Sequence, residues 1–355
     1  MKACCYYLWN FSKMRPTDNL NIVELKPLIT PRQLRQRLSL SDKQAKVVLD
    51  ARDDIKSIIT HRDKRMLVIA GPCSIHDEAA SIDYAQRLAA IQKKVSDKVL
   101  ILMRAYFEKP RTTIGWKGML YDPDLNGSYN MEKGLEKARS IMLKIISLGV
   151  PVATEVLEPI VPQYLTDLIS WVAIGARTTE SQVHRQMASG LSMPIGFKNA
   201  TDGSLDVAAA AIKTARNPHY FFGIDIDGRV AIAETRGNAY THFVLRGGAK
   251  PNYESEYIAF AEALLKKARI GTGIVVDCSH GNSYKDYKKQ RNVVEDIISQ
   301  KRDGNKSIVG LMLESFIEPG GQDMAIDNLQ YGISVTDECI GWDETEELIN
   351  RIANI

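Results

Sequence analysis

The chain has 355 residues, of which 45% are hydrophobic and 25% charged, and its formal net charge is +3. These values are ordinary for a globular protein in water, and so small a net charge does not indicate a nucleic-acid-binding surface. The five cysteines are dispersed, unlike those of a secreted disulfide scaffold, and no apolar stretch is long enough to span a bilayer. We therefore expect a cytoplasmic protein with neither nucleic-acid nor membrane partners.

Two helices are expected in an N-terminal extension of residues 1–60. Thr30 and Pro31 are typical of a helix N-cap and first position, and a second helix is predicted over residues 40–59. These helices could close the bottom of the fold or contact a neighbouring subunit. Residues 61–355 are assigned to one catalytic domain.

Eight short apolar runs follow, most of them separated by stretches with helical spacing. They cover residues 66–69, 99–102, 151–153, 171–174, 194–197, 242–245, 274–276 and 308–313. Continuous apolar runs are typical of strands buried on both faces. Eight of them predict an α/β fold, a closed (β/α)8 TIM barrel, whose catalytic residues gather at the C-terminal ends of the strands.

The region between the fifth and sixth of these runs breaks the alternation. Residues 220–224 and 229–232 are mostly apolar, and the Asp227-Gly228 pair lies between them. This pattern predicts a β-hairpin at about residues 218–236, inserted between barrel strands 5 and 6. A hairpin on the outer wall is not needed for closure, so it could build an interface or a regulatory pocket.

Several runs lead to residues with metal-binding side chains. Cys73, His280, Glu314 and Asp337 follow the first, seventh and eighth runs. Together they offer soft and hard donors that suit a divalent cation. Taken singly, a buried Cys is usually a packing residue and a His a hydrogen-bonding group, but a shared rim favours a metal site.

Four cations end other runs: Arg104, Arg177, Lys198 and Arg246. Charges of one sign at one barrel mouth repel each other unless an anion lies among them. A small substrate with phosphate and carboxylate groups fits, because Arg binds both in bidentate fashion. The alternative is a set of salt bridges with Asp and Glu.

The long loop after the second run contains Lys109, Arg111 and Thr112 around a stiffening proline. These donors predict a second anion site near the first. The alternative is a solvated basic loop.

These motifs resemble the type I 3-deoxy-D-arabino-heptulosonate 7-phosphate (DAHP) synthases, most closely the tyrosine-sensitive branch of feedback-regulated isoenzymes. The similar segments are residues 71–77, 103–113, 175–182, 196–199, 245–248, 277–282 and 334–342. The resemblance extends from about Thr30 onward, whereas residues 1–10 match nothing. It implies condensation of phosphoenolpyruvate (PEP) with erythrose 4-phosphate, the first step of the shikimate pathway.

The resemblance also implies a role for each group. The metal ligands would be Cys73, His280, Glu314 and Asp337, with Mn²⁺ expected ahead of Fe²⁺, Co²⁺ or Zn²⁺. PEP would be bound by Arg104, Arg177, Lys198 and Arg246, and erythrose 4-phosphate by Lys109, Arg111 and Thr112. Lys109, Glu155 and Asp337 are the expected catalytic residues, with Glu155 and Asp337 as rivals for the group that orients water.

The family's inhibitor pocket lies between the hairpin and neighbouring helices, often completed by a partner's N-terminal segment. The matching positions here are Pro162, Gln163, Met187, Leu191, Ser192, Phe221, Gly223 and Ala233. Phenylalanine-sensitive relatives tend to carry Ser where this chain has Gly223, so the resemblance implies tyrosine as effector. A homodimer and a homotetramer both fit.

Two alternatives are weighed against this assignment. A sister synthase condenses PEP with arabinose 5-phosphate, and the intact segment 109–112 argues against it. A non-catalytic amino-acid sensor could use the same barrel, and the complete set of metal-binding residues argues against that.

Overall fold

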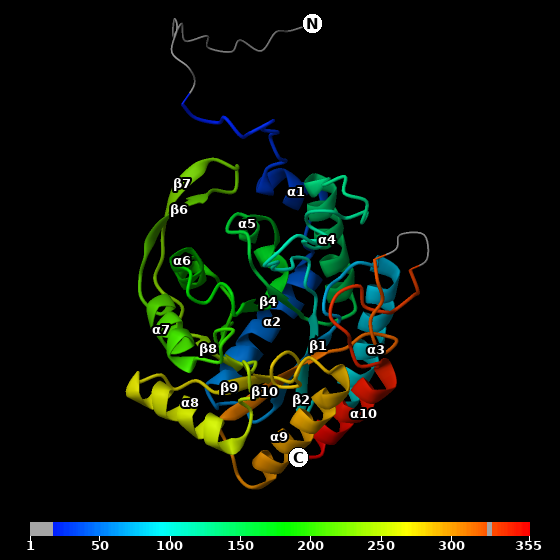
Figure 1. Ribbon diagram of the computed structural model, residues 1–355, viewed down its shortest axis with the longest axis vertical. Helices are drawn as coiled ribbons and strands as arrows, with labels where there is room; N and C mark the ends of the chain where they lie inside the picture. Colours follow the sequence, from blue (N-terminus) through cyan, green and yellow to red (C-terminus); the bar gives the residue numbers. More distant parts are fainter. Residues whose placement is uncertain (1–16, 325–328) are drawn as a thin grey trace, which may run out of the picture.

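The computed structural model describes residues 17–324 and 329–355, so residues 1–10, which match no motif, lie outside the described part. Within it, eight parallel strands close into a barrel in the order β1-β10-β9-β8-β5-β4-β3-β2 (Figure 1). The strands are β1 (Met66–Gly71), β2 (Val99–Arg104), β3 (Val152–Glu155), β4 (Ile169–Ile174), β5 (Ile195–Lys198), β8 (Thr241–Leu245), β9 (Ile274–Asp277) and β10 (Ile308–Glu314). The predicted (β/α)8 barrel is confirmed.

Helices alternate with the strands and surround them (Figure 1). They are α1 (Pro31–Arg37), α2 (Asp42–Ile59), α3 (Glu78–Val95), α4 (Met131–Ser147), α5 (Pro162–Leu165), α6 (Gln182–Gly190), α7 (Leu205–Ala215), α8 (Ser255–Lys267), α9 (Gln290–Arg302) and α10 (Trp342–Ala353), with short 3₁₀ helices η1 (Thr166–Leu168) and η2 (Tyr287–Lys289). None of the helices in the described part combines the length and apolar character needed to cross a membrane.

Side-chain capping decides where the first two helices begin. Thr30 caps α1 and Ser41 caps α2, each in a reciprocal pair with a Gln three residues later. The predicted start of α1 at Pro31 is correct. The prediction for α2 began two residues early, because Ser41 is held outside the helix in an extended conformation.

Helix α2 closes the bottom of the barrel, at the N-terminal ends of the strands. Its buried residues Ile55, Ile58 and Ile59 join the interior cluster that fills the barrel around Trp171. The carbonyl of Ile59 also accepts a 2.7 Å hydrogen bond from the amide of Gly273, just before β9. A larger apolar layer lies between the strands and the outer helices. This packing leaves the opposite end of the barrel for chemistry.

The inserted hairpin consists of β6 (Tyr220–Ile224) and β7 (Val230–Glu234), which form a separate antiparallel sheet outside the barrel. Its position between β5 and β8 confirms the insertion between barrel strands 5 and 6. Helix α1 binds the tip: the Arg32 amide donates to the Ile226 carbonyl at 2.8 Å, and the Arg32 side chain pairs with Asp227 at 2.6 Å. The N-terminal extension therefore contacts the hairpin of its own chain.

Candidate active site

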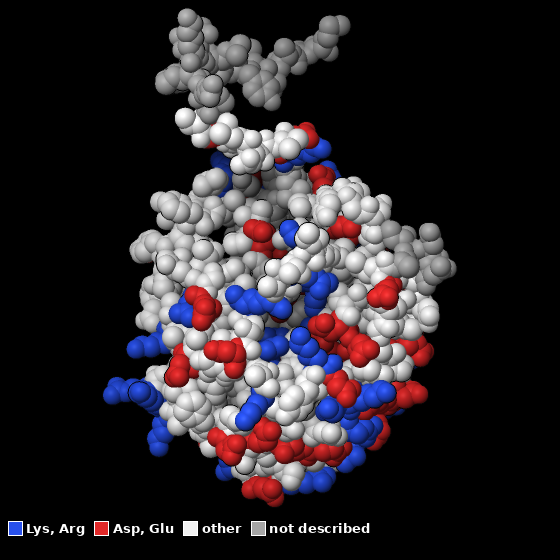
Figure 2. Space-filling view, in the orientation of Figure 1, with Lys and Arg blue, Asp and Glu red and all other residues white. Residues whose placement is uncertain are grey.

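A cavity opens at the C-terminal ends of the strands and gathers most of the predicted substrate-binding residues. Its lining includes Arg104, Lys109, Arg111, Glu155, Arg177, Lys198, Arg246, His280, Lys285 and Asp337. Figure 2 shows Lys and Arg side chains clustered near the centre of the face in view. Thr112 is exposed on its loop and is not part of the lining.

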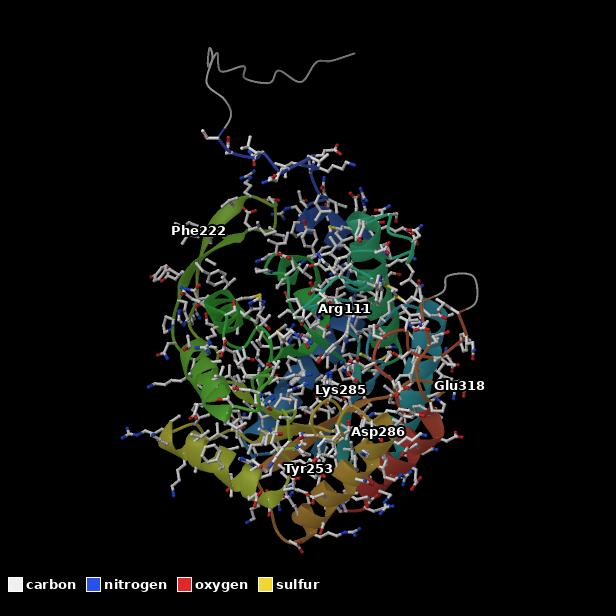
Figure 3. All side chains as sticks on the ribbon, viewed as in Figure 1. Arg111, Phe222, Tyr253, Lys285, Asp286 and Glu318 are labelled. Atoms are coloured by element: carbon white, nitrogen blue, oxygen red, sulfur yellow. The ribbon has the colours of Figure 1, made fainter. Side chains whose placement is uncertain are left out.

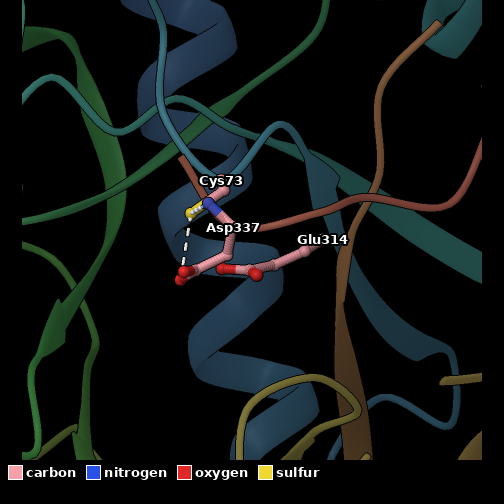
Figure 4. Close-up of side chains that lie close together, drawn as sticks. All are labelled: Cys73, Glu314 and Asp337. Carbon is pink, nitrogen blue, oxygen red and sulfur yellow. Dashed lines mark hydrogen bonds between the residues drawn. The ribbon is translucent and has the colours of Figure 1, made fainter. Parts of the chain in front are cut away.

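Three of the four predicted metal ligands converge in this region. One donor atom each from Cys73, Glu314 and Asp337 lies within 4.8 Å of the other two (Figure 4). Cys73 and Glu314 are buried, whereas Asp337 is exposed. His280 lies beside this group, with its Nε2 atom 3.7 Å from Glu314 Oε1. A thiol, two carboxylates and an imidazole at this spacing fit a divalent metal ion.

Asp277 orients two of the predicted residues. Its Oδ2 atom lies 3.0 Å from Lys198 Nζ and 3.0 Å from His280 Nδ1. Asp277 is fully buried, and although burial alone would raise the pKa of this carboxyl, the charges of His280 and Lys198 hold it well below the usual range. Because Nδ1 of His280 is occupied, Nε2 faces Glu314, an arrangement typical of metal-binding histidines.

Arg104 is one of the four cations predicted at the rim, the cation cluster of Arg104, Arg177, Lys198 and Arg246. It also contacts two of the four predicted metal ligands, the metal-binding group of Cys73, His280, Glu314 and Asp337. Its guanidinium donates to Glu314 Oε1 and to the carbonyl of Cys73, both at 2.8 Å. It also stacks on Tyr106, with Cζ 3.7 Å from the ring centroid. An Arg in this position keeps Glu314 ionised, since, although burial alone would raise the pKa of that carboxyl, the charge of Arg104 lowers it.

Lys109, on the loop after β2, contacts the thiol of Cys73. Its Nζ atom lies 2.9 Å from Cys73 Sγ. Burial raises the pKa of the Cys73 thiol, and the nearby carboxylate of Glu314 raises it further. A bound cation acts in the opposite direction, because a metal ion favours the thiolate.

The salt-bridge alternative holds for two of the four cations. Arg104 pairs with Glu314, and Lys198 pairs with Asp277. Arg177 and Arg246 make no ion pair with the described residues, and the Arg246 guanidinium donates instead to the carbonyl of Gly247 at 3.2 Å. The cavity therefore contains positive charge that acidic residues do not neutralise.

The position of the Glu155 carboxylate, at the end of β3, requires that residue 175 has no side chain. A Cβ atom on Gly175 would lie 2.2 Å from Glu155 Oε1. Glu108 is buried close by, where its two carboxyl oxygens accept hydrogen bonds from the amides of Leu157 and Glu158, each at 3.2 Å. Burial raises the pKa of Glu108 to about 8, so this carboxyl is mostly protonated at neutral pH.

The predicted effector-binding residues lie on α5, on α6 and just after it, and on the hairpin, along one side of the barrel (Figure 1). Helix α6 packs against β6, and the hydroxyls of Ser189 and Thr235 lie 2.6 Å apart. In β6, Phe221 and Gly223 are half-buried while their neighbours Tyr220 and Phe222 are exposed. Phe221 and Gly223 therefore lie on the opposite face of the hairpin from Tyr220 and Phe222.

Sequence reasoning assigned no role to Asp277, Tyr106 or Lys285. Asp277 ends a predicted strand three residues before His280, and this spacing is a usable signal for a supporting carboxylate. The sequence around Tyr106 and Lys285 contains no comparable signal. Their positions became evident only from the structure, in which Tyr106 contacts Arg104 and Lys285 lines the cavity.

Comparisons with known proteins agree with this geometry. The family model described as DAHP synthetase I family matches residues 39–350. The chain is 50% identical to the Tyr-sensitive phospho-2-dehydro-3-deoxyheptonate aldolase of Escherichia coli, covering 94% of this chain and 95% of that protein. It is 48% identical to the Trp-sensitive enzyme of the same organism, covering 96% and 98%. A solved phospho-2-dehydro-3-deoxyheptonate aldolase from Francisella tularensis is similar in structure, with a TM-score of 0.93, 48% identity, and coverage of 94% of this chain and 98% of that one.

Proposed function

The chain belongs to the DAHP synthetase I family, and we propose how its residues carry out the reaction of that family. The enzyme condenses PEP with D-erythrose 4-phosphate and water to give DAHP and phosphate, the first step of the shikimate pathway. It is a transferase under feedback control by an aromatic amino acid. The observation that supports the proposal is the cavity that is lined both by the cation cluster and by His280 and Asp337 of the metal-binding group.

The family implies a divalent metal ion, and Cys73, Glu314, Asp337 and His280 are proposed as its ligands. Their mixture of thiolate, carboxylate and imidazole donors is compatible with Mn²⁺, which we propose, and also with Fe²⁺, Co²⁺ or Zn²⁺. When bound, the metal supplies a Lewis acid for the aldehyde oxygen of erythrose 4-phosphate. Asp277 and Arg104 keep His280 and Glu314 in place for this role.

PEP is proposed to bind among Arg104, Arg177, Lys198 and Arg246. The uncompensated charges of Arg177 and Arg246 attract its phosphate and carboxylate, while the ion pairs of Arg104 and Lys198 fix the geometry of the floor. Arg111, and Thr112 after movement of its loop, are proposed to bind the phosphate of erythrose 4-phosphate. Arg111 is prepared for this, because its Nε donates to the Trp116 carbonyl at 2.8 Å and its terminal nitrogens are left for a ligand.

The enol carbon of PEP attacks the aldehyde, and Lys109 is placed to donate a proton to the oxygen that becomes a hydroxyl. The carbon that bears the phosphate then takes on positive character and adds water. Glu155 lines the cavity and is proposed to orient that water, with Asp337 as the rival base. Loss of phosphate completes the reaction.

Tyrosine is the proposed effector, bound by Pro162, Gln163, Met187, Leu191, Ser192, Phe221, Gly223 and Ala233. The Tyr-sensitive and Trp-sensitive relatives are almost equally similar to this chain, so overall identity does not distinguish the two effectors. Gly223 supports tyrosine, because the missing side chain leaves room for a hydroxyl. A site that hydrogen-bonds a hydroxyl can discriminate strongly against a ligand that lacks it.

We also propose a homodimer or homotetramer in the cytoplasm, where the phosphorylated substrates are metabolites. The outer face of the hairpin supports assembly: Tyr220, Phe222, Val230 and Ile232 are each at least 64% exposed. Exposed apolar side chains grouped in this way are typical of protein interfaces. Residues 1–60 are proposed to serve this interface and its regulation, and residues 61–355 to form the catalytic barrel.

The proposal is tested by kinetics on enzyme freed of metal with a chelator. We expect activity with PEP and erythrose 4-phosphate to disappear and to return with Mn²⁺, and no activity with arabinose 5-phosphate. Cys73→Ala should abolish the recovery at low metal concentration. Cys278→Ala is the matched control, because Cys278 is equally buried but lies outside the metal-binding group. Full activity of a verified metal-free sample would contradict the metal assignment.

Reciprocal variants separate the two substrate sites. Arg246→Ala should raise the KM for PEP roughly tenfold to hundredfold, because contacts to charged groups are worth about 1.5–3 kcal/mol. Arg111→Ala should raise the KM for erythrose 4-phosphate instead. An effect of Arg246→Ala confined to the aldose would overturn the assignment.

A further inference from the structure

Lys285 lies in the rim cavity, although no step of the proposed reaction uses it. It lines the cavity that contains Arg111 and Arg246, and it also lines an adjoining cavity that contains Ser283 and Thr336. The two cavities share His280, Lys285 and Asp337. Arg111 and Lys285 are both labelled near the centre of the same face in Figure 3. Lys285 therefore stands beside the metal-binding group, where the two cavities meet.

The negative charge of a bound phosphate group would exceed the positive charge that Arg111 alone supplies, so a second cation such as Lys285 is needed to balance it. A phosphate monoester carries close to two negative charges at neutral pH, since its second pKa is about 6. Arg111 supplies one positive charge, and Lys109 is engaged with the Cys73 thiol. Lys289, four residues beyond Lys285, is 3.8 Å from Asp286, but Lys285 makes no ion pair with the described residues.

The backbone holds Lys285 at a fixed place relative to the metal-binding group. His280, Tyr284 and Lys285 have φ values of 55°, 54° and 61°, in the left-handed region that side chains other than glycine seldom adopt. The amide of Lys285 donates to the carbonyl of His280 at 2.7 Å. Such conformations cluster at ligand-binding sites, where the surrounding structure maintains them.

We propose that Lys285 binds the phosphate of erythrose 4-phosphate together with Arg111, and so makes the enzyme select a phosphorylated aldose. This inference rests on the proposed function and adds a specificity-determining residue to it. With the phosphate held between Arg111 and Lys285, the aldehyde end of the substrate can reach Lys109 and the metal-binding group. The second cation matches the second negative charge of the phosphate.

The test compares erythrose 4-phosphate with D-erythrose, which lacks the phosphate, at saturating PEP. Lys285→Asn removes the charge, and Asn tolerates the left-handed backbone better than most residues. Lys285→Arg restores the charge. Lys288→Asn is the control, because Lys288 is exposed on the same segment and lines neither cavity.

We expect Lys285→Asn to lower the ratio of kcat/KM for erythrose 4-phosphate to kcat/KM for D-erythrose by roughly tenfold to hundredfold. Lys285→Arg should recover part of that ratio, and Lys288→Asn should leave it within about twofold of the wild-type value. Calorimetric titration with erythrose 4-phosphate alone should show the weakest binding for Lys285→Asn, intermediate binding for Lys285→Arg, and similar affinities for Lys288→Asn and the wild type. This second measurement does not depend on turnover.

Three results would overturn the role of Lys285. An equal loss with both aldoses would mean that the residue only maintains the turn at His280. A change confined to the KM for PEP would assign Lys285 to the other substrate, and an unchanged ratio would remove it from recognition. A wild-type enzyme inactive with PEP and erythrose 4-phosphate would instead overturn the proposed function itself, which separates the two failures.

Discussion

The backbone amide of Cys73 donates a hydrogen bond to the thiol of Cys339 across 3.4 Å. Both residues are fully buried, and they come from the loops after the first and the last strand of the barrel. A proposed metal ligand therefore lies directly beside a second thiol.

This contact predicts reversible oxidative inactivation of the metal-free enzyme. Hydrogen peroxide should convert the two thiols to a Cys73–Cys339 disulfide and be reduced to water, and a thiol reagent should restore activity. A bound metal ion should protect the enzyme from this oxidation, because the Cys73 thiolate would then be coordinated to the metal. Peptide mapping of the inactive enzyme measures the outcome, with Cys339→Ser as the variant that should resist inactivation. Finding both thiols free in inactive enzyme would refute the prediction.

Gly175→Ala should impair catalysis through Glu155. The added Cβ would lie 2.2 Å from Glu155 Oε1, so the carboxylate must leave its place in the cavity. Overpacking of this kind typically lowers folding stability by about 1–3 kcal/mol, and displacement of the carboxylate that orients water should lower kcat roughly tenfold or more. Gly271→Ala is the control, because nothing lies within 4 Å of a Cβ at that position. A wild-type kcat for Gly175→Ala would show that the position of Glu155 is not critical.

Glu108 should make folding stability depend on pH. Its pKa is about 8 in the folded enzyme, raised mainly by burial from an ordinary value of 4.5. Its contribution to stability is thus fully present below about pH 4.5 and is lost as the pH rises towards 8, because the unfolded chain releases this proton first. Glu108→Gln cannot ionise, and it keeps an oxygen acceptor for one of the two amides, so the comparison uses its pH dependence and not its absolute stability.

Denaturant midpoints at pH 6 and pH 9 measure this effect. We expect the wild-type enzyme to lose more stability than Glu108→Gln between the two values. Identical losses would mean that Glu108 is ionised in the folded enzyme throughout this range.

Gly223→Ser should shift effector preference from tyrosine towards phenylalanine. A Cβ at this position meets only Phe221 Cε2, at 3.8 Å, so Ser fits without distorting the hairpin. The new side chain would occupy the space proposed for the tyrosine hydroxyl. Inhibition curves with tyrosine, phenylalanine and tryptophan measure the shift, and the rate without inhibitor reports correct folding. Stronger inhibition of the wild type by phenylalanine would contradict the role assigned to Gly223.

The sequence by itself determined the barrel, the hairpin and the kind of chemistry at the rim. The apolar runs are local patterns, and parallel strands bring their carboxyl ends to the same edge wherever the helices pack. Residues such as Arg104 and Glu314 could therefore be placed near each other without coordinates. The first helix start was also local, since Thr30 caps it through a residue three positions away.

Only the tertiary structure decided how these side chains pair. Asp277 contacts both Lys198 and His280, and Lys285 faces a cavity between loops. These relationships depend on strand register, side-chain rotamers and backbone turns contributed by segments far apart in the chain. A periodic pattern does not contain that information, because it records only the face on which a residue lies. The burial that raises the pKa of Glu108 has the same origin, since distant elements exclude the water around it.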